Sequence, residues 1–185
     1  MPLLKSKIPL AVAVLKKCPT GIQGLDEITG GGLPLGRPTL VCGSAGCGKT
    51  LLAMEFLVHG ARDLDEPGVF VSFEEPTADL IKNFASLGFD LNGLTARRKL
   101  TLDYIYIERS EIEETGEYDL GGLFIRLEQA LDEIGARRVV STPLRRSSPG
   151  SPTSLFYGLS CAVCSAGSKI RGSPPSSPVK AAKRP

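Results

Sequence analysis

The sequence has no apolar run approaching the length of a membrane-spanning helix, which is about 20 residues. A short apolar stretch at Ile8–Leu15 lies between lysines and lacks the small-residue cleavage site of a signal peptide. We interpret this stretch as an edge strand or a partner-docking segment. No targeting signal is evident, so we expect a cytoplasmic protein with no membrane partner.

Histidines and paired cysteines are also scarce. His59 is the only histidine, and we interpret it as a helix-face residue. The five cysteines are an odd number, which fits a reducing compartment better than a disulfide framework. Cys161 and Cys164 form one C-x-x-C without a second pair or a nearby histidine, so a zinc or redox site is weakly supported. Packing explains Cys42 and Cys47 better than redox chemistry does.

Acidic residues are absent from residues 141–185, which hold 7 Lys/Arg, 11 Ser and 7 Pro, whereas residues 1–140 carry a net charge of −5. We therefore divide the chain into an N-terminal segment (1–16), a domain (17–140) and a Ser/Pro/Arg-rich tail (141–185). One interpretation of the tail is a basic disordered segment that could touch nucleic acid or an acidic partner. The acidic domain offers no evident DNA-binding face, so we do not expect it to bind nucleic acid.

Residues 43–50 read Gly-Ser-Ala-Gly-Cys-Gly-Lys-Thr, a full match to the phosphate-binding loop G-x-x-x-x-G-K-[ST]. Glycines let consecutive backbone N–H groups point at phosphate oxygens. Lys49 supplies a cation for the β- and γ-phosphates, and the Thr50 hydroxyl can ligate Mg²⁺. A helix that starts near Lys49 adds its positive dipole end. We therefore predict ATP and Mg²⁺ as cofactors, bound by Gly43, Ser44, Ala45, Gly46, Cys47, Gly48, Lys49, Thr50 and Leu51.

Strand and helix patterns alternate around this loop. Strands are predicted at 38–42, 69–73 and 100–107 and from residue 137, and helices at 49–62, 78–87 (with Thr77 as N-cap) and 120–134. The run Gly30-Gly31-Gly32 predicts a turn-rich connector. This alternation predicts an α/β fold with a mostly parallel sheet.

Glu74 and Glu75 directly follow the 69–73 strand. Open α/β sheets bind ligands beyond the carboxyl ends of their strands, and γ-phosphate hydrolysis needs a group that orients or deprotonates water. Glu74 and Glu75 are therefore candidate catalytic residues. The alternative is that both are solvated charges before a helix, where glutamate suits the helix dipole.

Three segments together resemble the KaiC family of circadian-clock ATPases, and most closely its first RecA-like domain. They are the glycine-rich stretch 21–37, the loop 43–50 and the stretch 66–75, which ends in Phe-Glu-Glu, and the resemblance extends over about residues 17–140. It implies a RecA-like P-loop NTPase fold with ATP bound between the subunits of a hexameric ring. It also implies that the paired glutamates, here Glu74 and Glu75, act as catalytic acids and bases. The Ser/Thr autokinase activity known in the family resembles that of a second domain, which this chain lacks.

The resemblance stops where a P-loop enzyme needs its second carboxylate. The stretch 137–140 begins an apolar strand that the family continues with an apolar residue, Asp and Ser/Thr, whereas this chain continues Ser141-Thr142-Pro143. We hypothesise that the reading frame shifts after Val140. Suitable synonymous codons permit a shifted reading that begins Leu-Asp-Thr and continues with an amphipathic helix and a buried strand. As written, we expect a truncated sheet that lacks this strand and those after it, with unpaired edges and poor solubility.

Three functions remain open at this point. The first is a truncated KaiC-type ATPase that hydrolyses Mg-ATP slowly, and the second is a module that binds ATP without turnover. The third is a RecA-type recombination ATPase that acts on DNA, which would show salt-sensitive binding to single-stranded DNA.

Overall fold

The computed structural model describes residues 15–106, 120–142 and 159–162. The elements, in chain order, are β1 (Lys17–Cys18), α1 (Leu25–Ile28), β2 (Leu33–Pro34), β3 (Thr39–Val41), α2 (Lys49–Asp63), β4 (Gly68–Ser72), α3 (Thr77–Ala85), α4 (Leu91–Ala96), β5 (Leu100–Tyr104), α6 (Leu120–Ile134), β6 (Arg138–Ser141) and β7 (Leu159–Ala162). Within these ranges, no helix has the length and apolar character needed to cross a membrane. The apolar stretch predicted at Ile8–Leu15 falls outside the described residues except for its last one.

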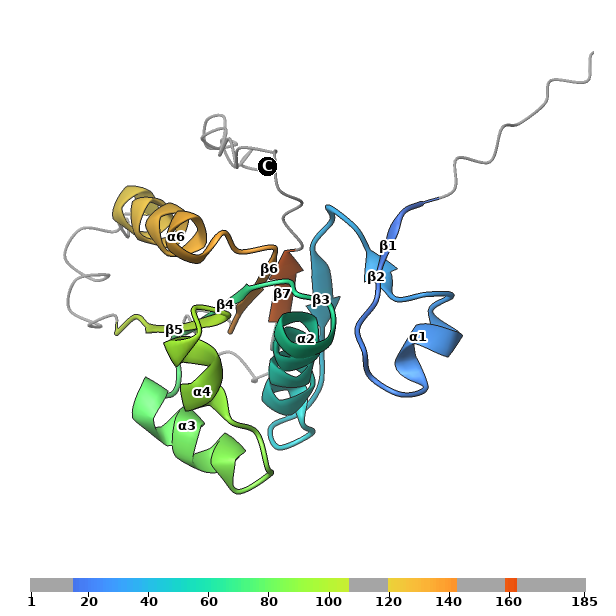
Figure 1. Cartoon of the computed structure of the whole chain (residues 1–185), viewed down its shortest axis with the longest axis horizontal. Helices are drawn as coiled ribbons and strands as arrows, with labels where there is room; N and C mark the ends of the chain where they lie inside the picture. The colour runs from blue at the N-terminus through green and yellow to red at the C-terminus, as the bar shows by residue number, and fades with distance from the viewer. Residues whose placement is uncertain (1–14, 107–119, 143–158, 163–185) are drawn as a thin grey trace, which may run out of the picture.

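The main sheet has five strands in the order β3-β7-β6-β4-β5 (Figure 1). Strand β4 pairs in parallel with β5 and with β6, whereas β7 is antiparallel to both β3 and β6. Strands β3, β6, β4 and β5 therefore all point the same way. The prediction of an α/β fold with a mostly parallel sheet is confirmed.

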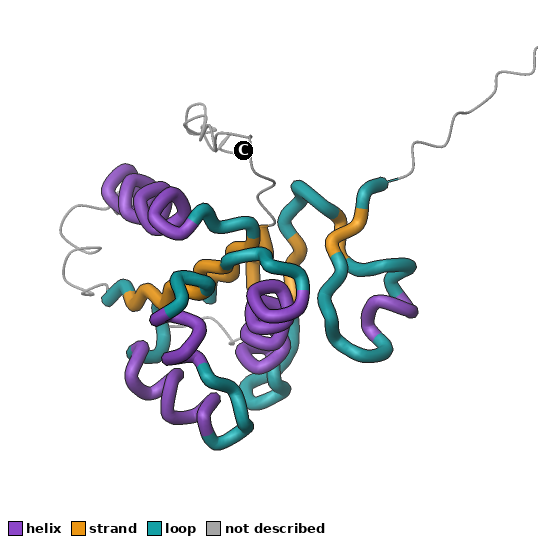
Figure 2. The backbone as a smooth tube through the Cα atoms, viewed as in Figure 1, coloured by secondary structure: helices purple, strands orange, loops and turns teal. Residues whose placement is uncertain are grey.

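Helices cover both faces of this sheet, as the tube in Figure 2 shows. Successive side chains of a strand point to opposite faces, so the fully buried strand β4 contributes to two cores. Phe70 packs with α2, α3 and α4, whereas Val69 and Val71 pack against the apolar face of α6. This double coverage explains why β4 is an unbroken apolar run in the sequence.

The helix and strand boundaries agree with the sequence patterns in most places. Helix α6 has the predicted bounds, and α2 extends the predicted helix by one residue. Thr77 is not the N-cap of α3, as we had predicted: it is the first helical residue, and Pro76 is the N-cap with φ −59° and ψ 148°. Proline fixes φ near this value and lacks an N–H, so it suits the entrance to a helix. Strand β5 ends at Tyr104, earlier than predicted.

The expectation that the sheet lacks the strand after residue 137, with unpaired edges there, is wrong. Residues 138–141 form β6, which pairs with β4 on one side and with β7 on the other. Strand β6 ends at Ser141, two positions before Pro143 in the sequence, so no proline falls within the strand. Among the described strands of this sheet, the outer edges belong to β3 and β5.

Candidate functional site

The phosphate-binding loop connects β3 to α2, as the motif predicts. Gly46 and Gly48 have φ values of 77° and 86°, a region that glycine enters without a steric penalty. Gly48 is the N-cap of α2 and offers no capping side chain to the first turn. The first N–H groups of a helix lack intrahelical acceptors, so the start of α2 presents donors and a positive dipole end at the loop.

The side chain of Lys49 folds back into the phosphate-binding loop. Its side chain is only 9% exposed, and its Nζ donates to the backbone oxygens of Gly43 at 3.0 Å and Ser44 at 2.6 Å. The same Nζ lies 3.5 Å from Cys47 Sγ. The ammonium therefore sits inside the curve that a phosphate would occupy, with residues 44–48 exposed around it. Thr50 and Leu51 follow in the first turn of α2.

The two predicted catalytic glutamates lie at the carboxyl end of β4. Glu75 is fastened there because its N–H donates to Ser72 Oγ at 3.0 Å, while Ser72 Oγ donates to the Glu75 carbonyl at 2.7 Å. The Glu75 carboxylate accepts a bond from Asn83 Nδ2 of α3 at 2.5 Å, whereas Glu74 is exposed. Glu75 is thus held toward α3, and Glu74 is the more accessible carboxylate of the pair.

Thr142 is a site residue that sequence reasoning did not single out. It directly follows β6, is 5% exposed, and donates its N–H to the Val71 oxygen at 2.9 Å. Its Oγ1 accepts a bond from the N–H of Phe73, also at 2.9 Å. Thr142 therefore lies beside the residue that precedes Glu74. Thr142 stands two residues after Val140, at the position where the family pattern has an aspartate. This position in the pattern could have identified it from the sequence.

These groups share one edge of the sheet because β3, β6 and β4 run parallel. Two strands separate β3 from β4, so the backbones of these strands are about 14 Å apart at the usual strand spacing. The phosphate loop, Thr142 and Glu74 therefore follow strands that end at the same edge of the sheet. Among the described residues, no group of three or more His, Cys, Asp or Glu side chains could hold a metal ion.

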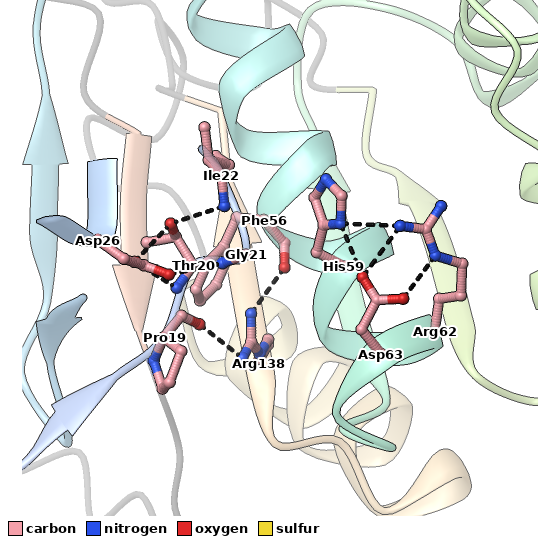
Figure 3. Close-up of polar contacts among 10 residues, drawn as sticks. All are labelled: Pro19, Thr20, Gly21, Ile22, Asp26, Phe56, His59, Arg62, Asp63 and Arg138. Carbon is pink, nitrogen blue, oxygen red and sulfur yellow. Dashed lines mark hydrogen bonds and ion pairs between the residues drawn. The ribbon is translucent and has the colours of Figure 1, made fainter. Parts of the chain in front are cut away.

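A second polar cluster, centred on Arg138, fastens the elements that carry the loop (Figure 3). Arg138 is fully buried, stacks on the Phe56 ring at 4.3 Å, and donates to the backbone oxygens of Phe56 and Pro19 at 2.8 and 2.9 Å. Its guanidinium also pairs with Glu66 at 2.7 Å. One side chain of β6 therefore joins α2 to the segment before α1. No pattern in the sequence predicts this role.

Asp26 organises that N-terminal segment. Its carboxylate accepts bonds from the Thr20 N–H and hydroxyl at 2.8 and 2.7 Å and from the Gly21 N–H at 3.0 Å. Burial acts to raise the pKa of Asp26, but these donors outweigh it and hold the pKa below its usual value. His59 lies on α2, as predicted, with its Nδ1 2.9 Å from Asp63 Oδ2. The hydrogen bond from Arg62, followed by that from His59, holds the Asp63 pKa well below its usual range.

The cysteines have different surroundings. Cys18 is buried, and burial raises the pKa of its thiol. Cys42 and Cys47 are exposed, and a side chain at Gly43 would overlap the Cys47 sulfur, so Cys47 fills the space that this glycine leaves. Cys161 belongs to β7, whereas Cys164 lies outside the described residues.

A sequence model described as "ATPase: KaiC" matches residues 18–144. This chain belongs to the KaiC ATPase family. It is 64% identical over 126 residues to "Circadian clock protein KaiC2" of Synechocystis sp., which covers 68% of this chain and 22% of that protein. It is 45% identical over 125 residues to "Circadian clock oscillator protein KaiC" of Parathermosynechococcus lividus, which covers 68% of this chain and 23% of that protein.

The protein of that same name from Picosynechococcus sp. is 44% identical over 129 residues, which cover 70% of this chain and 25% of the relative. This KaiC-family chain thus spans about a quarter of the length of the curated relatives it matches. Family membership supports a RecA-like α/β domain that binds nucleotide.

Magnesium, which P-loop ATPases use, fits the side chains of this site incompletely. Protein-bound Mg²⁺ is usually held by one or two carboxylates together with substrate phosphates. Here the loop offers the Thr50 hydroxyl, but the position after β6 carries the neutral Thr142. The residues present therefore do not make a complete protein-held magnesium site.

Proposed function

We propose that this chain binds ATP through residues 43–51 and hydrolyses it slowly or not at all. The observation that carries the proposal is the Lys49 ammonium, buried in the curve of a loop in which Gly46 and Gly48 are left-handed and Gly48 caps α2. This arrangement places a cation, backbone donors and a helix N-terminus together at the loop.

On ATP binding, the Lys49 ammonium would exchange its hydrogen-bond acceptors in the loop for acceptors on the nucleotide. Its Nζ would leave the backbone oxygens of Gly43 and Ser44 and take phosphate oxygens instead. Phosphate oxygens carry negative charge, so they attract the ammonium more strongly than the neutral backbone oxygens do, and the exchange favours the bound state. The N–H groups at the start of α2 would then face the same phosphates.

Thr142 is the reason to expect weak hydrolysis. A neutral hydroxyl that already accepts the Phe73 N–H neither neutralises phosphate charge nor holds a cation firmly. Glu74, exposed at the end of β4, is the residue we propose to orient an attacking water, and Glu75 supports it through its bonds to Ser72 and Asn83. Binding without turnover is the second candidate function, and Thr142 favours it.

The exposure of loop residues 44–48 supports a nucleotide site that a neighbouring subunit could complete. We therefore propose ATP-dependent self-association, as the family's ring would require. A chain that stays monomeric with saturating Mg-ATP in analytical ultracentrifugation would count against this part of the proposal.

Measuring affinity and turnover together tests the proposed function. Titration of a fluorescent ATP analogue is expected to show saturable binding, which Lys49→Ala weakens at least tenfold, a change of about 1.4 kcal/mol. Glu74→Gln is expected to leave affinity unchanged and to remove any hydrolysis. Binding that is insensitive to Lys49→Ala would overturn the proposal, and fast hydrolysis by the unaltered chain would overturn its second half.

A further inference from the structure

Strand β3, which carries the phosphate loop, has few ties to the rest of the molecule. It has three residues, none of which is buried, and Leu40 is 63% exposed. An apolar cavity of about 390 Å³ lies between β3 and α2, lined among others by Leu40, Val41, Ala53 and Phe56. Side-chain packing therefore holds β3 only loosely, and its backbone pairing has to supply most of the restraint.

That pairing comes from β7 alone among the described strands. Leu40 pairs with Ser160, which pairs on its other side with Ser141 of β6. Thr39 likewise pairs with Cys161, which pairs with Val140. Strand β7 is thus the bridge between the loop's strand and the sheet that carries Glu74, and it lies outside the residues 18–144 that match the KaiC family.

We propose that β7 positions the phosphate loop for ATP, so that residues 159–162 act as a positioning element of the nucleotide site. The proposal rests on the proposed ATP binding. Helix α2 anchors one end of the loop through fully buried residues such as Met54 and Leu57, so β3 is the end that is free to move. If β3 leaves the sheet, the binding-competent loop is populated only in part, and the apparent dissociation constant rises in inverse proportion to the populated fraction.

The thermodynamic coupling between β7 docking and ATP binding is reciprocal, which gives a test on the unaltered full chain. If docked β7 favours ATP binding, bound ATP must favour docked β7 by the same factor. Hydrogen exchange measured by mass spectrometry, with and without saturating Mg-ATP, is expected to show slower exchange at 159–162 and 39–41. Strand β5, at the far edge of the sheet, serves as the internal control and is expected to change little.

The outcomes of this experiment separate the two proposals. Slower exchange at 43–50 without any change at 159–162 would overturn the role of β7 and leave ATP binding intact. No change anywhere, together with no binding of the fluorescent ATP analogue, would overturn ATP binding itself.

A pair of variants at one position gives the second test. Ser160→Pro removes a backbone donor from the centre of β7, and we expect at least tenfold weaker ATP affinity. Ser160→Val keeps the backbone and suits a strand, so it should bind like the unaltered chain. Equal affinity in the two variants would overturn the proposal. Far-UV circular dichroism checks the fold of each, and if Ser160→Pro unfolds, the exchange experiment decides.

Discussion

At the scale of single residues, Arg138 illustrates how a buried charge is tolerated when each nitrogen of its guanidinium has an acceptor. Its guanidinium meets the Glu66 carboxylate and two backbone oxygens, and it leaves room for no side chain at Gly60. Its neighbour Arg137 is exposed and carries the same charge. The two arginines therefore form a matched pair in which burial alone differs.

We expect Arg138→Met to lower the free energy of unfolding by about 3 kcal/mol, because it leaves the Glu66 carboxylate and two backbone oxygens without their donor. Urea unfolding followed by circular dichroism measures this change. Arg137→Met is the control and should stay within about 0.5 kcal/mol of the unaltered chain. Similar losses in the two variants would show that charge, not the buried contacts, matters at this place.

Thr142 gives the second prediction at this scale. Thr142→Asp places a carboxylate directly after β6 while keeping an oxygen that can accept the Phe73 N–H. We expect Mg²⁺-dependent ATP hydrolysis to rise at least tenfold, because the carboxylate can help hold the cation on the phosphates. Thr142→Asn has a similar shape without the charge and should show no rise. Equal rates in the two variants would exclude a metal-related role for this position.

At the scale of elements, the start of α2 depends on a left-handed glycine. Gly48 and Gly36 have similar φ values of 86° and 72°, and neither has a neighbour that a side chain would meet. An alanine at either position should destabilise the fold by about 1 kcal/mol from backbone strain alone. Only Gly48 lies in the phosphate loop.

We therefore expect Gly48→Ala to weaken ATP binding strongly, because the loop's N–H groups would turn away from the phosphates, while Gly36→Ala leaves affinity unchanged. Thermal melts and titration of a fluorescent ATP analogue measure the two effects separately. Equal loss of affinity in both variants would mean that global destabilisation, not loop geometry, sets the binding.

The segment that enters α1 depends on the ionised Asp26. Its folded pKa lies below the usual value of 3.8, so its bonds stabilise the fold above that value and are lost as pH falls through the folded pKa. Asp26→Asn should therefore lower the melting temperature at neutral pH, and the difference should shrink below about pH 3.8. Glu27→Gln, an exposed change on the same helix, is the control. A difference that does not depend on pH would rule out the charge as the cause.

At the scale of the whole molecule, the chain joins a KaiC-family region to a tail of different composition. The family match ends at residue 144, and the last acidic residue of the chain is Glu133. Our hypothesis of a shifted reading frame after Val140 stays a prediction. Sequencing the gene across codons 138–145 is expected to reveal an insertion or a deletion. An intact frame with no KaiC-like reading in the alternative frames would refute it.

Only the parts of the site that have a local signal in the sequence could be predicted. The phosphate loop, α2 and α6 were predictable because their signals are contiguous motifs and helical periodicities. The start of a strand at residue 137 was predictable from its apolar pattern, but its place in the sheet was not, because we expected this strand to be lost and it pairs with β4 and β7. The contact between Phe73 and Thr142 joins residues 69 positions apart in the chain, and no local pattern carries that information.

The sequence by itself therefore determined the family, the α/β class and the place of the phosphate-loop motif, because each depends on short-range patterns of residue type. Only the tertiary structure decided that Arg138 is buried, that Thr142 bonds to Phe73, and that Leu159–Ala162 enters the sheet between β3 and β6. The physical reason is that strand pairing and burial depend on contacts between segments that are far apart in the chain. A four-residue strand has too short a sequence pattern to predict its position in the sheet.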